Sequence, residues 1–116
     1  MNDVVLGVKV TPENLITLQC ALRLLETKGW TRAAYARDVL GRAISPYDDG
    51  AACYCLAGAI YAASPTGSID TVALAVLDKL LPKTTTLARF NDSTTRTSSQ
   101  VTDLLRSAID LFTQGN

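Results

Sequence analysis

The hydrophobic pattern is densest in the middle of the chain. Residues 51–63 read Ala-Ala-Cys-Tyr-Cys-Leu-Ala-Gly-Ala-Ile-Tyr-Ala-Ala, and no comparable uncharged apolar run occurs elsewhere. A helix that is apolar on all sides belongs inside a protein, where other elements cover it. We therefore expect a central helix over residues 51–63, around which the remaining segments pack.

Start and stop signals of amphipathic helices occur on both sides of this run. Thr11-Pro12-Glu13 combines a capping hydroxyl, a proline at the first helical position and an acid in the first turn, and Gly29 ends the helix that follows. Ser68 is expected to cap a second helix, which ends at Pro82 because proline cannot continue a helix. Both segments repeat apolar residues on one face, so we expect both to pack against the central helix.

The C-terminal third carries the clearest amphipathic helix. Thr97 and Gln100 have the spacing of a capping box, an apolar stripe follows them, and Gly115 closes the helix. Two shorter helical pieces are expected over residues 31–38 and 87–90. The chain thus has four main helices and short additional turns.

One segment favours a strand. Residues 4–10 are rich in β-branched side chains, and residues 42–45 are the best partner for them. A length of 116 residues suits one domain with one core. We therefore predict an all-α fold: a single compact domain over residues 1–116, with four to five helices around the central helix and at most a short N-terminal strand.

Composition and charge exclude several functions. Eleven basic and eleven acidic residues cancel, so no overall field favours nucleic acid or an anionic membrane. The chain contains no histidine, which removes Ser-His and Cys-His catalytic pairs and imidazole metal ligands. Three cysteines, no signal-peptide pattern and a central run shorter than the about 20 apolar residues of a membrane span lead us to expect a soluble, cytoplasmic protein with free thiols.

Cysteines and aspartates offer little for metal or cofactor chemistry. On a helix, Cys53 and Cys55 would lie about 200° apart and could not share an ion. We interpret them as buried structural thiols, although a nucleophilic Cys53 is the alternative. Asp48 and Asp49 are adjacent carboxylates, but they stand where the central helix needs a cap. We expect no metal site, no cofactor and no catalytic residue.

Several short motifs together resemble a known family. In chain order they are Gly29-Trp30-Thr31, Tyr35-Ala36-Arg37-Asp38, Cys55-Leu56-Ala57-Gly58-Ala59, Asn91-Asp92 and Arg96-Thr97. This set resembles an uncharacterised family of small bacterial, plasmid and phage proteins, over roughly residues 29 to 112. Phe90 stands where that family has tryptophan, and Gln100 where it has an acid. The resemblance implies an architecture and a link to mobile elements, but no activity.

The loop after Phe90 holds the strongest group of polar residues. Asn91, Asp92, Arg96 and Thr97 are candidates for a ligand or partner site, with Arg96 as an anchor for an anion. In the structural interpretation they clip the loop in place. Asn91 and Asp92 then bond backbone amides or the hydroxyls of two tyrosines on the central helix, and Arg96 pairs with an acid such as Asp38. We favour the clip. The two tyrosines are Tyr54 and Tyr61.

A second candidate surface is the basic stretch over residues 23–42. Its arginines lie near Trp30 and Tyr35, a combination found in binding hot spots and in weak nucleic-acid surfaces. A solvated helix face is the simpler interpretation, because the net charge is zero.

These observations favour a non-enzymatic protein-binding or accessory protein, a phage or mobile-element factor that acts on a host protein. The first alternative is a small enzyme or ligand-binding protein that uses Asn91, Asp92 and Arg96. The second is weak nucleic-acid binding through the basic face at 23–42. The binding residues we predict are Trp30, Arg32, Tyr35, Arg37, Asn91, Asp92, Arg96 and Thr97.

Overall fold

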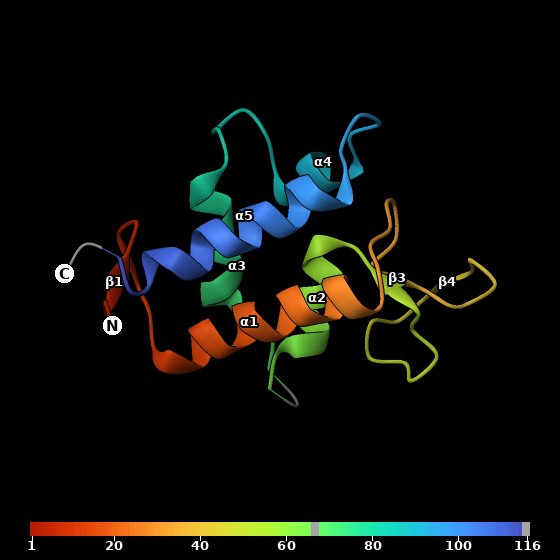
Figure 1. Ribbon diagram of the computed structural model, residues 1–116, viewed down its shortest axis with the longest axis horizontal. Helices are drawn as coiled ribbons and strands as arrows, with labels where there is room; N and C mark the ends of the chain where they lie inside the picture. Colours follow the sequence, from red (N-terminus) through yellow and green to blue (C-terminus); the bar gives the residue numbers. More distant parts are fainter. Residues whose placement is uncertain (66–67, 115–116) are drawn as a thin grey trace.

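The computed structural model describes residues 1–65 and 68–114, and within them five helices accompany two small antiparallel sheets (Figure 1). The prediction of an all-α fold is therefore wrong, and the chain has a mixed α and β fold. The helices are α1 Pro12–Thr27, α2 Leu56–Ala63, α3 Thr71–Leu80, α4 Leu87–Asp92 and α5 Ser98–Leu111. The strands are β1 Val4–Val5, β2 Val8–Lys9, β3 Ala36–Arg37, β4 Ala43–Ile44 and β5 Cys53–Tyr54.

The N-terminal strand pairs with its own neighbour in the sequence. β1 and β2 form a hairpin in which Val5 lies opposite Val8, and the predicted pairing with residues 42–45 is wrong. Leu6 and Gly7 both have positive φ angles, 51° and 80°. A two-residue turn of this kind matches the right-handed twist of the flanking strands, so the local hairpin forms without a distant partner.

The middle of the chain forms a three-stranded sheet, and two of its strands, β3 and β5, lie where we had expected helix. β3 lies between β4 and β5, so that Ala36 is paired with both Ile44 and Tyr54. The predicted helix over 31–38 is absent, and the central helix begins at Leu56 rather than at residue 51. An uninterrupted apolar run such as residues 51–63 has no periodicity that distinguishes a buried strand from a buried helix, which explains the second error.

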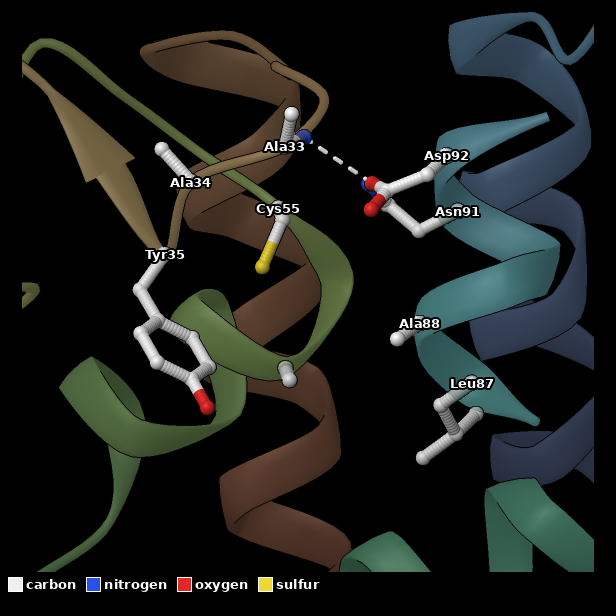
Figure 2. A pocket seen from close by; sticks show the side chains of 9 residues that line it. Ala33, Ala34, Tyr35, Cys55, Leu87, Ala88, Asn91 and Asp92 are labelled. Carbon is white, nitrogen blue, oxygen red and sulfur yellow. Dashed lines mark hydrogen bonds between the residues drawn. The ribbon is translucent and has the colours of Figure 1, made fainter. Parts of the chain in front are cut away.

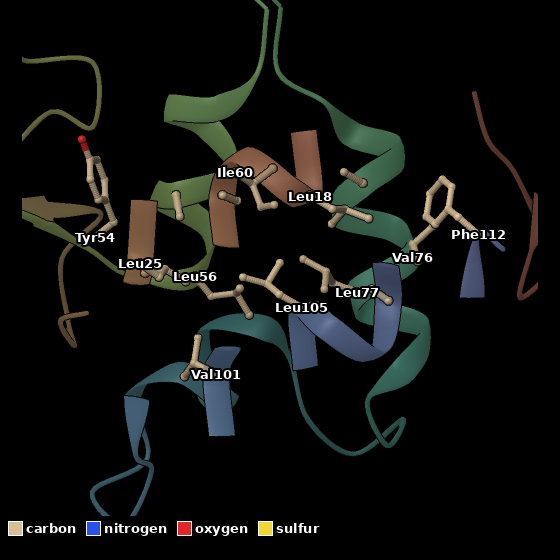
Figure 3. Close-up of a cluster of buried hydrophobic side chains, with 14 of the residues drawn as sticks. Leu18, Leu25, Tyr54, Leu56, Ile60, Val76, Leu77, Val101, Leu105 and Phe112 are labelled. Carbon is tan, nitrogen blue, oxygen red and sulfur yellow. The ribbon is translucent and has the colours of Figure 1, made fainter. Parts of the chain in front are cut away.

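The helices form a body with a shared core. α1 packs against α2, α3 and α5, and α3 also packs against α5. Figure 3 shows side chains from these helices pointing into one interior. Its fully buried members include Leu18, Leu56, Ile60, Leu77 and Leu105. The shortened α2 thus remains a central element, because burial of its apolar residues joins it to α1, α3 and α4.

Two of the helices, α1 and α5, begin at the capping residues that the sequence indicated. Thr11 caps α1, and Thr97 caps α5 by accepting a hydrogen bond from the Gln100 amide at 3.2 Å, as predicted. α3 is capped by Asp70 rather than by Ser68. α4 contains the predicted helical turn at 87–90 and extends to Asp92. The predicted end of the last helix at Gly115 lies outside the described residues.

The N-terminal hairpin and the end of α5 lie at one end of the molecule and the three-stranded sheet at the other (Figure 1). None of the helices in the described part of the chain combines the length and the apolar character that crossing a membrane requires.

Candidate functional site

Asn91 joins three segments that are far apart in the sequence. Its side chain is 2% exposed and lies in the last turn of α4. Oδ1 accepts hydrogen bonds from the indole nitrogen of Trp30 at 2.6 Å and from the Leu56 amide at 3.0 Å. The side-chain amide donates to the carbonyl oxygen of Thr31 and to Oδ1 of Asp92, both at 3.0 Å. Asn91 therefore holds the loop after α1 and the first turn of α2 against α4.

Asp92 holds the next residues of the loop after α1 in the same way. Its Oδ1 also accepts a hydrogen bond from the Ala33 amide at 2.9 Å. Ala33 has a φ of 62°, a conformation that is uncommon for a residue with a side chain. The carboxylate thus supports a turn that would otherwise be unfavourable.

Arg32 and Arg96, two of the predicted binding residues, donate hydrogen bonds to backbone carbonyl oxygens. Arg32 donates from Nε to the Ser93 oxygen at 3.0 Å and from its terminal nitrogen to the Arg96 oxygen, while its guanidinium lies over the Trp30 ring. Arg96 donates to the Phe90 oxygen at 2.8 Å and lies over the Phe90 ring. The predicted pairing of Arg96 with Asp38 is wrong.

Arg37 lies on β3 and braces the following turn. It donates to Thr31 Oγ1 at 3.0 Å, to the Arg32 oxygen at 3.1 Å and to the Gly41 oxygen at 3.0 Å. Asn91 and Asp92 accept hydrogen bonds from the backbone amides of Leu56 and Ala33, which confirms one kind of partner predicted for them. The other predicted kind, the two tyrosine hydroxyls, is wrong, because Asn91 bonds the Trp30 indole and the Thr31 oxygen instead.

Of the predicted binding residues, the structure brings six together. They form one connected cluster through the contacts above: Trp30, Arg32, Arg37, Asn91, Asp92 and Arg96. The other two lie outside these contacts. Thr97 caps α5, and Tyr35 is exposed with its ring 5.2 Å from that of Tyr61.

A groove lies beside this cluster, between α2 and α4 (Figure 2). Its volume is about 460 Å³, a size that can receive a small ligand or a side chain. Small and apolar side chains line most of it, and Asp92 lies at one end. The lining residues are Ala33, Ala34, Tyr35, Cys55, Ala57, Leu87, Ala88, Asn91 and Asp92.

Cys55 lies on the groove wall at the start of α2. Asp48 and Asp49, the caps we had predicted, do not cap this helix, because Cys55 Sγ accepts the Gly58 amide at 3.2 Å. Burial raises the pKa of the Cys55 thiol, while hydrogen bonds from backbone amides partly oppose that rise. The thiol therefore stays protonated at neutral pH and acts as a neutral part of the wall.

The state of Cys55 can be checked by alkylation. With iodoacetamide at pH 8, we expect Cys55 in the folded protein to react at least several-fold more slowly than the exposed Cys20, because the thiolate is the nucleophile and burial disfavours it. Peptide mass spectrometry measures both rates, and unfolding in guanidinium should equalise them. Equal rates in the folded protein would contradict the assignment.

The turn between β3 and β4, residues 38–42, is held by its own hydrogen bonds and carries an exposed apolar pair that we had not predicted as a binding feature. We call it the hairpin tip. Asp38 Oδ1 accepts the amides of Leu40 and Arg42, both at 2.9 Å, and Gly41 has a φ of 82°. The Arg42 amide is the main cause of the lowered pKa of Asp38, so the bracing carboxylate is charged. The tip exposes Val39 by 86% and Leu40 by 72%.

The hairpin tip projects from the helical body in Figure 1. The sequence did contain a signal for it. The Asp-Val-Leu-Gly-Arg pattern places two apolar residues inside a turn, where they cannot be buried by their own hairpin.

Comparison with known proteins supports the resemblance noted in the sequence. No curated protein and no solved structure matches the chain. The motif set that carries the resemblance and the bacterial, plasmid and phage distribution stay predictions. Residues 10–111 match the Family of unknown function (DUF6197), and the chain therefore belongs to that family.

Proposed function

We propose that this protein is a non-enzymatic protein-binding module, and that it binds through the hairpin tip together with the neighbouring groove. The observation that carries the proposal is the exposed apolar pair Val39 and Leu40 on a turn held by its own hydrogen bonds. Burying an apolar side chain of this size contributes about 1.5 kcal/mol or more. A rigid turn loses little conformational freedom on binding, so most of that gain is available for affinity.

The groove is close enough to the tip to belong to the same surface. Tyr35 lines the groove, β3 follows it directly, and Val39 is only four residues further on. Four extended residues span about 13 Å. A standard protein interface buries about 800 Å² on each partner, which covers both features.

Side chains that hydrogen-bond to the loops hold this surface in place. Arg37 bonds the Gly41 oxygen in the tip, and Asp92 bonds the Ala33 amide beside the groove. The proposed roles of Trp30, Arg32 and Arg96 are likewise to position the loop. Direct contact with a partner is proposed for Tyr35 and Asp92, whose side chains are exposed.

The two alternatives have less support. An enzyme would need Asn91, Asp92 and Arg96 to face one cavity, but Arg96 does not line the groove and instead bonds the Phe90 oxygen. Phosphate binding by the 23–42 stretch would need free guanidinium groups. Arg37 donates to the chain itself, and Arg42 pairs with Asp38 at 2.8 Å.

The kind of partner that we propose follows from the resemblance described above. A small protein of phage or mobile-element origin would meet a host protein in the cytoplasm. The family match leaves this partner to experiment.

Replacing Val39 and Leu40 together by serine tests the proposal. Recovery of proteins from a lysate of the encoding organism, measured by cross-linking and quantitative mass spectrometry, should fall by at least about tenfold, because the apolar burial of both side chains is lost. Ile16→Ser is the matched control, since Ile16 is an exposed apolar residue on α1. The exposed substitutions should change unfolding free energy by less than about 0.5 kcal/mol. Equal recovery by all three proteins would refute the proposed surface.

A further inference from the structure

We infer that the groove between α2 and α4 receives a lysine side chain of the protein partner, with the ammonium group on Asp92. The inference rests on the proposed function for the partner being a protein. The chemistry of the groove can be tested without that partner.

The first support is the charge of Asp92. Within residues 1–65 and 68–114, the ion pairs join Arg42 to Asp38 and Arg106 to Glu26 and Asp103, and none includes Asp92. Its Oδ1 is occupied by the Ala33 and Asn91 donors. A carboxylate without a cationic partner at the end of an apolar groove favours a cationic ligand there.

The nearby arginines do not neutralise this carboxylate. Arg32 donates to the carbonyl oxygens of Ser93 and Arg96, and Arg96 donates to that of Phe90. Asp92 and Cys55 both line the groove, so the charge of the carboxylate lies beside the groove wall. Figure 2 shows the Asp92 carboxylate turned toward the Ala33 and Cys55 side of the gap.

The second support is that the first turn of α2 offers little to an anion. The Leu56 amide is bound by Asn91, and the Gly58 amide is bound by Cys55 Sγ. A helix N-terminus binds anions through free amides, and these two are already used. The polar groups that line the groove therefore favour a ligand that donates hydrogen bonds over a ligand that accepts them.

The third support is the shape and composition of the walls. Ala57, Leu87, Ala88 and the ring of Tyr35 line the groove. The four methylene groups of lysine pack well against such a surface while the ammonium remains at the edge. Because Oδ1 of Asp92 is occupied, the carboxylate suits a single-point ammonium contact better than the two-point contact that arginine prefers.

Methyl NMR of the protein with labelled alanines tests this inference. The probe is N-acetyl-lysine N-methylamide, and its neutral counterpart is N-acetyl-norleucine N-methylamide. We expect the lysine probe to shift the Ala57 and Ala88 methyl signals with an affinity on the order of millimolar, and the norleucine probe to bind about fivefold more weakly. Equal affinity of the two probes, or no shift at these methyl groups, would overturn the inference.

The variant that isolates the charge is D92N. It keeps an oxygen that can accept from the Ala33 amide, so it should reduce lysine binding about fivefold and leave norleucine binding unchanged. The matched control is Asp103→Asn, which removes an exposed carboxylate on α5 and should change neither affinity. Unchanged lysine binding by D92N would refute the role of Asp92.

A second measurement avoids any dependence on the folding of that variant. Raising the salt concentration should weaken the lysine probe and not the norleucine probe, because salt screens an exposed ion pair. An arginine probe that binds more tightly than lysine would overturn the choice of lysine.

The two proposals can fail separately. The serine substitutions at Val39 and Leu40 lie outside the groove lining and should leave probe binding unchanged. If the lysine probe binds the groove but the serine variant recovers as much partner as the unchanged protein, the hairpin tip alone is refuted. If the serine variant recovers less partner but the lysine probe does not bind the groove, the lysine site alone is refuted.

Discussion

Replacing Asn91 by alanine should lower the free energy of unfolding by about 3 kcal/mol, because each buried group left without its partner costs about 1–3 kcal/mol. The change removes the acceptor of Trp30 Nε1 and of the Leu56 amide, and the donor to the Thr31 oxygen. The Leu56 amide is buried, so water cannot easily replace the lost acceptor. Urea unfolding followed by circular dichroism measures the loss.

Two comparisons sharpen this test. Thr94→Ala changes an exposed residue of the same region and should cost less than about 0.5 kcal/mol. Trp30 is the single tryptophan, so its fluorescence in folded Asn91→Ala reports whether the indole has lost its partner. A stability loss below about 1 kcal/mol with unchanged emission would refute the central role of Asn91.

Replacing Gly58 by alanine should cost about 2 kcal/mol or more, since inserted atoms in a packed region force the backbone to move. A Cβ at this position would lie 2.7 Å from the carbonyl carbon of Tyr35 and closer still to its oxygen. That oxygen also accepts the Cys55 amide at 3.1 Å, so the contact holds the loop against α2. Urea unfolding measures the change.

Whether Gly58→Ala lowers or raises the free energy of unfolding distinguishes a steric clash from an open helix position. In an open helix position, alanine is more favourable than glycine by about 1 kcal/mol, so a substitution without a clash should stabilise the protein. The reverse change at the adjacent position, Ala57→Gly, calibrates the propensity and should cost about 1 kcal/mol. A Gly58→Ala protein that is more stable than the original would contradict the close approach.

Local signals predicted a helix wherever its ends were encoded nearby. The Thr11 and Thr97 caps lie within three residues of the groups that they satisfy, and both helices began as expected. Residues 51–55 were predicted wrongly as helix, because an apolar run suits a buried strand equally well. Its conformation depends on β3, which lies sixteen residues or more earlier in the chain.

In the candidate site, too, local features could be predicted and contacts between distant segments could not. The motif residues Asn91 and Asp92 could be singled out from their type and spacing, but their partners could not. Asn91 bonds residues 35 and 61 positions away, and Asp92 bonds one 59 positions away. The exposed apolar pair of the hairpin tip was not predicted, because the exposure of Val39 and Leu40 depends on where β3 and β4 lie.

The amino-acid sequence by itself determined the starts of α1 and α5, the apolar centre and the membership of one family, because these depend on short-range capping, on burial and on residue order. Only the tertiary structure decided that the uncharged run divides into β5 and α2, and that Asn91 holds this junction to Trp30. It alone placed Gly58 against the Tyr35 backbone and opened the groove beside Asp92. Those features are contacts between segments far apart in the sequence, and no local pattern specifies which segments meet.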